Sequence, residues 1–101
     1  MENKVINGTQ KIIGTTASVI SQPVFNGQRA VLALTNISTA GQVISVGVLS
    51  QAKAGQGIVL QPLDRYVESQ DAGYSPSNEQ VTAISSGAGG VLAIQEVIEL
   101  E

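Results

Sequence analysis

The densest group of side chains with chemical potential is acidic. Asp64, Glu68 and Asp71 lie close together in the sequence. Carboxylate oxygens are the ligands that Ca²⁺ prefers, and a pair of carboxylates can supply the acid and base of glycoside hydrolysis. However, Arg65 lies between them, and exposed charges are the more common arrangement in proteins. We therefore expect Asp64, Glu68 and Arg65 to form a solvated strand edge with local ion pairs.

The other candidates for catalysis are weaker. The chain has no histidine and no cysteine, so the usual nucleophile–base pairs cannot form from its residues. Ser50 and Lys53 match a Ser-x-x-Lys pattern, but that chemistry needs a helix start and further motifs. The glycine segments 54–57 and 87–90 look like phosphate loops, yet a predicted strand follows each of them. We expect turn glycines with positive φ there, and predict no enzyme, catalytic residue, cofactor or metal site.

Three residues are candidates for contacts with a partner. Glu96 shares one strand face with four apolar residues, Leu92, Ile94, Ile98 and Leu100. Such a charge either guards the strand against unwanted pairing or forms an ion pair at a subunit interface. Tyr66 and Tyr74 flank one polar loop and are the chain's two tyrosines. They are the residues available for stacking on a ligand ring.

The composition favours an assembling protein. Charged residues make up 13% of the chain, and the net charge is −3. The five basic residues form no stripe, so we expect no nucleic-acid partner. No apolar run is long enough to span a membrane, and residues 1–7 lack the apolar core of a secretory signal, so we expect no membrane partner. A surface poor in charge loses little hydration when a partner covers it.

Short β-branched runs separated by turn residues dominate the chain. Residues 11–21 are predicted to form one strand with a bend at Gly14. Residues 29–36 alternate, which places Leu32 on one face and Arg29 on the other. Residues 81–100 contain two apolar runs joined by glycines, which predicts a closing β-hairpin.

These elements predict an all-β, single-domain antiparallel β-sandwich of jelly-roll or Greek-key type. Seven to eight short strands with turns roughly every 8–12 residues are typical of that architecture. We expect the sandwich domain over residues 11–101. An N-terminal arm at residues 1–10 is expected to precede it and to be able to add a strand to a neighbouring sheet.

The order of the strands also points to a family. The sequence Arg-Ala-Val-Leu-Ala-Leu-Thr-Asn at 29–36 is followed by Ile-Ser-Val-Gly-Val at 44–48 and by Ala-Gly-Gln-Gly-Ile-Val-Leu-Gln-Pro at 54–62. A polar loop and the β-rich segment at 81–96 close the pattern. Over residues 28–97 this order resembles the small β-sandwich virion proteins of tailed bacteriophages, which include capsid decoration (cement) proteins and head-fibre bases.

The resemblance implies a structural virion protein, foremost a capsid decoration or cement protein that binds and stabilises the phage capsid lattice. Its partner would be the major capsid protein or another virion protein, and it would form a homo-oligomer, with a trimer favoured. It would be made in the host cytoplasm and reside on the capsid surface. The alternative is a receptor- or carbohydrate-binding head module of a phage fibre, with Tyr66 or Tyr74 stacked on a sugar ring.

Overall fold

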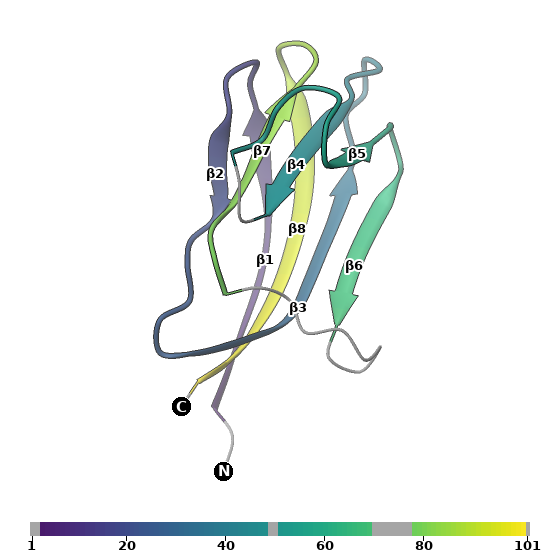
Figure 1. Ribbon diagram of the computed structural model, residues 1–101. Coiled ribbons are helices and arrows are strands. Elements are labelled where there is room, and N and C mark those ends of the chain that lie inside the picture. The colour runs from purple at the N-terminus through teal and green to yellow at the C-terminus, as the bar shows by residue number, and fades with distance from the viewer. Residues whose placement is uncertain (1–2, 49–50, 70–77, 101) are drawn as a thin grey trace.

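The computed structural model describes residues 3–48, 51–69 and 78–100, which form eight strands and no helix (Figure 1). The described residues therefore include no helix that could cross a membrane. The molecule is elongated, about 44 Å long and 22 Å wide, and the first and last described residues, Asn3 and Leu100, pair at one end of it. The strands are β1 (Asn3–Ile13), β2 (Ser18–Ser21), β3 (Gly27–Asn36), β4 (Ile44–Val48), β5 (Ile58–Leu60), β6 (Arg65–Ser69), β7 (Val81–Ser85) and β8 (Gly90–Leu100).

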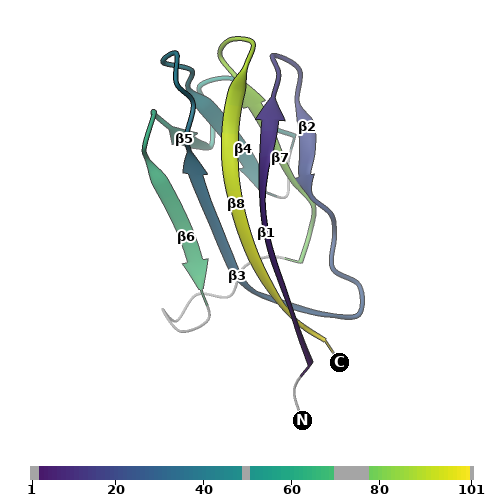
Figure 2. The same ribbon diagram turned by 180° about the vertical axis from the view of Figure 1, so that it is seen from behind.

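The strands form two antiparallel sheets packed face to face. One sheet has the order β1-β8-β3-β6 and the other has the order β2-β7-β4-β5. Figure 2 shows the first sheet in front of the second. This is the strand order of an eight-stranded jelly roll, in which consecutive strands lie in opposite sheets except for β4 and β5, which pair with each other. The predicted all-β antiparallel sandwich is confirmed.

The core lies between the sheets and is built from aliphatic side chains at alternating strand positions. Leu32 and Leu34 of β3 and Leu92 and Ile94 of β8 form its centre on one side. Alternation along each strand sends every second side chain into the interior, so the β-branched residues of the sequence fill a pleated surface. The remaining core residues are Ile13, Ile20, Ile44, Val46, Leu60, Val81 and Ala83.

The predicted closing hairpin at 81–100 is wrong. β7 pairs with β2 and β4 in one sheet, whereas β8 pairs with β1 and β3 in the other. The glycine-rich link at 86–89 therefore crosses between the two layers. Directly after this link, the first residue of β8 is Gly90, where an added Cβ would lie 2.5 Å from Ser85 Oγ. The close approach favours glycine at this position. Two apolar runs joined by a tight turn look the same in sequence whether they pair with each other or across the sandwich.

The start of the chain also differs from the expected division. Residues 3–10, expected as an arm, continue directly into residues 11–13 as the single strand β1. It pairs with β8 from Asn3 opposite Leu100 to Ile13 opposite Gly90. The strand predicted over 11–21 is divided, because residues 14–17 carry the chain from one sheet to the other.

Candidate functional site

A buried polar cluster surrounds the side chain of Arg29, which is 0% exposed. Its Nε donates to Glu96 Oε2 at 2.8 Å, and its Nη2 donates to Ser21 Oγ at 2.8 Å and to the Gln22 carbonyl at 2.9 Å. Its Nη1 donates to the Glu79 carbonyl at 3.0 Å. The Ser21 hydroxyl donates to Glu96 Oε2 as well. The cluster thus ties β2, β3, β8 and the segment before β7 together.

A β-bulge in β3 places Arg29 in the interior. The β3–β8 register passes from Arg29 to Val31 while advancing one residue along β8, so Ala30 is an extra residue. A bulge of this kind shifts the alternation of side chains by one. Arg29 therefore lies on the same side as Leu32, and its predicted outward position is wrong. Strict alternation cannot reveal a bulge that no glycine marks.

Glu96 lies on the core side of β8, as the alternation over 92–100 predicts. Its side chain is 12% exposed, and its carboxylate forms the ion pair with Arg29 of the same chain. A charge buried in this way must be paired to be tolerated, and here the partner comes from the neighbouring strand. A contact of Glu96 with another subunit remains a prediction.

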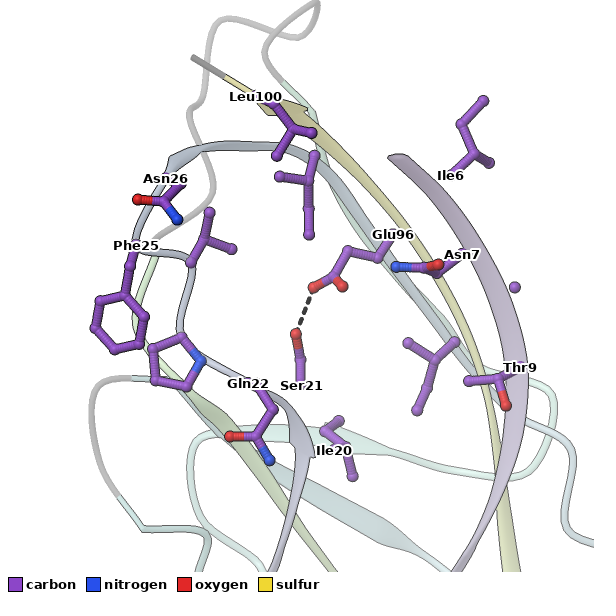
Figure 3. A pocket seen from close by; sticks show the side chains of 15 residues that line it. Ile6, Asn7, Thr9, Ile20, Ser21, Gln22, Phe25, Asn26, Glu96 and Leu100 are labelled. Carbon is purple, nitrogen blue, oxygen red and sulfur yellow. Dashed lines mark hydrogen bonds between the residues drawn. The ribbon is translucent and has the colours of Figure 1, made fainter. Parts of the chain in front are cut away.

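An open groove of about 730 Å³ adjoins this cluster (Figure 3). The inner side of β1 and β8 forms one wall, and the segment 22–26 forms the other. Ile98 contributes apolar surface to the groove, and its polar lining consists of Asn7, Thr9, Ser21, Gln22, Asn26 and Glu96. Phe25 lies at the rim and is 85% exposed. The groove offers a contact surface, but its carboxylate is already held in an ion pair.

The structure separates the acidic residues singled out in the sequence. Asp64 is exposed, and its Oδ2 accepts a hydrogen bond of 3.0 Å from the backbone N–H of Gln61. Glu68 is only 7% exposed and accepts a hydrogen bond from the hydroxyl of Tyr66. The solvated position expected for Glu68 is therefore wrong. Asp71 lies outside the described residues, and among those described no three metal-ligating side chains are grouped.

The two tyrosines differ in how far the structure describes them. Tyr66 is half-buried on the inner side of β6 and packs against the core cluster. Its hydroxyl is engaged by Glu68, one strand pleat away. Tyr74 lies outside the described residues. A partner contact at either residue stays a prediction.

The motif and loop residues have structural roles where they are described. Ser50 lies outside the described residues, and the Lys53 carbonyl accepts a hydrogen bond from the N–H of Gln56 at 3.0 Å in a turn. Gly55 and Gly57 have φ of +75° and +74°, as expected for turn glycines. A strand follows this loop and also the loop at 87–90, so neither is a helix-based phosphate site.

Asn36 is a buried polar residue whose role was not predicted from the sequence. Asn36, at the end of β3, is 0% exposed. Its Nδ2 donates to the carbonyls of Gln42 and Leu60 at 2.8 Å each, and its Oδ1 accepts from the N–H of Ser38 at 3.0 Å. Asn36 therefore fastens the loop between β3 and β4 and the end of β5 to the core. Its position two residues after Leu34, on the core side, was the available signal.

The outward side of the sheet β1-β8-β3-β6, called the outer face below, is broad and poor in charge. Lys4 and Glu99 lie opposite each other at one end, and Arg65 lies on the edge strand β6. A shallow hollow of about 320 Å³ lies between them. The register assigns to this face Lys4, Ile6, Gly8, Gln10, Ile12, Gln28, Val31, Ala33, Thr35, Arg65, Val67, Ser69, Val91, Ala93, Gln95, Val97 and Glu99.

Comparison with known proteins yields a structural match only. No family model and no curated protein matches the sequence. The fold is similar to a solved structure described as "Bacillus endospore appendages form a novel family of disulfide-linked pili", with a TM-score of 0.61 and 13% identity. The match covers 98% of this chain and 87% of that one. At this identity the similarity shows a shared fold, and the present 101 residues contain no cysteine for a disulfide link.

Proposed function

We propose that the chain is a structural virion protein, a capsid decoration (cement) protein that docks on a phage capsid lattice and stabilises it. The observation that carries the proposal is the outer face, where the charged residues stand at the margins and uncharged side chains, most of them apolar or small, fill the centre. Such a surface can be covered by a partner with little loss of hydration. The resemblance of residues 28–97 to phage virion proteins supports the choice of a capsid lattice as the partner.

A rigid sandwich suits this role. The two sheets are joined by an aliphatic core and by the Arg29 cluster, so the outer face is held in one shape. Weak contacts of a fixed surface add up when many copies bind repeated sites of a lattice. The solved structure of similar fold is described as forming pili, which are also assemblies of repeated subunits. This parallel supports an assembling role.

The proposal includes a partner and a location. The partner is the major capsid protein or another virion protein, and the protein is made in the host cytoplasm and carried on the capsid surface. A homo-oligomer fits a symmetric lattice site, and the trimer implied by the resemblance fits a three-fold site.

Adding the purified protein back to capsids that lack it tests the proposal. The wild-type protein is expected to bind saturably, measured by co-sedimentation, and to raise the temperature at which the capsids open. Val67→Glu places a charge on the outer face, where Val67 is 52% exposed, and should abolish binding. Val59→Glu makes the same change on β5 of the other sheet and should bind as wild type does. Equal binding of both variants, or no binding by wild type, contradicts the proposal.

The groove favours one alternative, a receptor- or carbohydrate-binding head module of a fibre. Phe25 at its rim presents an exposed aromatic ring of the kind on which sugars stack. Binding to a glycan array that disappears in Phe25→Ala would support this module in place of capsid decoration. An array without binding would leave capsid decoration as the function.

A further inference from the structure

The edge strand β1 is longer and more regular than the other three edge strands, although it carries Lys4 and Lys11. β5 has three residues, β2 has four residues and a register shift, and β6 has five residues. β1 has eleven residues, pairs with β8 in continuous register and contains no proline. In the described residues β8 is the only strand beside it. A long, regular edge of this kind is a template for pairing with another strand.

The side chains of β1 are uncovered as well. Residues 4–12 are all exposed. Ile6 and Ile12 are 68% and 76% exposed, and both belong to the outer face because they lie opposite Val97 and Val91 of β8. Two large aliphatic side chains on an open edge strand are an unusual surface for an isolated subunit. Ile6 and Ile12 are equally far from Thr9 in the sequence, and this symmetry indicates which strand could pair with β1.

We propose that β1 pairs antiparallel with β1 of a second copy about a two-fold axis at Thr9. Residues opposite each other in an antiparallel ladder share a face, so a symmetric pairing joins residues of like parity. Centred on Thr9, the ladder places Ile6 of each copy opposite Ile12 of the other. Aliphatic β-branched pairs and Thr–Thr pairs are both favourable across strands. The strand is therefore complementary to itself.

The charges of β1 agree with this pairing. Lys4 is on the outer face, whereas Lys11 is on the inner side, where its Nζ donates to the Val19 carbonyl at 2.9 Å. The two lysines have unlike parity, so no symmetric register can place them opposite each other. In the register centred on Thr9, Lys11 faces Asn7 of the second copy. No like charges oppose each other in this register, so the lysines do not hinder pairing with a second copy.

The contact has a consequence for assembly. It joins two four-stranded sheets into one continuous sheet of eight strands and places their outer faces side by side. The smallest assembly that this contact forms is a dimer, and the three-fold contact of the proposed trimer would use another surface. The inference stands apart from the capsid proposal, because it concerns the edge of the sheet and needs no lattice.

Single cysteines provide a direct test, because the chain has none of its own. Directly opposed residues have Cα atoms roughly 4.5–5.5 Å apart, within disulfide range. Thr9→Cys should therefore form a disulfide-linked dimer under mild oxidation. Asn7→Cys and Lys11→Cys should each stay monomeric on a denaturing gel when oxidised alone, but should cross-link when the two variants are mixed.

Sedimentation of the unmodified protein completes the test. We expect a dimer whose dissociation constant rises at least tenfold in Ile12→Lys and is unchanged in Val59→Lys on β5. Cross-linking that peaks at another residue of β1 overturns the register. A monomer in sedimentation together with no cross-link at Thr9→Cys overturns the contact itself. Capsid binding by such a monomer would leave the proposed function intact.

Discussion

Removing the carboxylate of Glu96 should destabilise the protein strongly. Glu96→Ala deletes the acceptor of the Arg29 Nε hydrogen bond and of the Ser21 hydroxyl, while Arg29 stays buried. Breaking a buried ion pair from one side costs about 3–5 kcal/mol, because the remaining charge is uncompensated. Glu96 is 12% exposed and borders the groove, so water can approach the vacated site. We therefore expect the lower end, about 3 kcal/mol.

This loss is large for a domain of this size. Domains of this kind have unfolding free energies of about 5–15 kcal/mol, and each 1 kcal/mol shifts the midpoint of thermal unfolding by about 4–8 °C. Glu96→Ala should thus lower the midpoint by roughly 12–24 °C in calorimetry. Gln95→Ala is the matched control, since it changes the exposed neighbour on the outer face and should cost less than about 0.5 kcal/mol.

A double variant tests the cause. Arg29→Met with Glu96→Leu removes both charges and fills the space with apolar atoms. Replacing a buried pair in this way is often neutral or stabilising, but the Gln22 and Glu79 carbonyls then lose their Arg29 donors, so the double variant should recover part of the loss. A cost below about 1 kcal/mol for Glu96→Ala would place the pair among exposed ion pairs and refute the reasoning. A double variant less stable than Glu96→Ala would refute it too.

Three further changes test the packing. Asn36→Ala leaves backbone groups of the β3–β4 loop and of the end of β5 without partners and should cost at least about 3 kcal/mol in urea unfolding, whereas a cost below about 1 kcal/mol would contradict its role. Gly27→Ala places a Cβ in a clash with the Glu99 carbonyl and should lose about 1–3 kcal/mol, while Gly14→Ala, with nothing within 4 Å, should be close to neutral in the same measurement. Leu63 has φ of +71° and is 80% exposed, so Leu63→Gly should raise the unfolding midpoint; a lower midpoint would show that its backbone is not strained.

The sequence predicts the architecture better than the strand partners. Alternation and β-branched residues are local properties, so they identify the strands and the sandwich. Pairing depends on residues far apart in the chain. Residues 81–100 therefore suggest a hairpin, although β7 and β8 lie in different sheets. The link at 14–17 is similar, because a bend within a strand and a crossing between sheets use the same residue types.

The sequence predicts the core-side position of Glu96 in the polar cluster but not that of Arg29. The periodicity of β8 places Glu96 on the core side, but its partner Arg29 was assigned to the opposite face of β3. The bulge at Ala30 turns the Arg29 side chain to the core side of β3. Nothing in the local sequence indicates a bulge at that position. The burial of Glu68 could not be predicted for a similar reason. A carboxylate three residues after Arg65 is expected to be exposed unless it is known which side of β6 it lies on.

The central claim is that the outer face docks on a capsid lattice. Electron cryomicroscopy of the intact particle that carries this protein tests it most directly. We expect jelly-roll density at repeated lattice sites, with the outer face against the capsid protein and Val67 within the contact. Particles that lack this density, or that carry it with the outer face toward solvent, would contradict the proposed function.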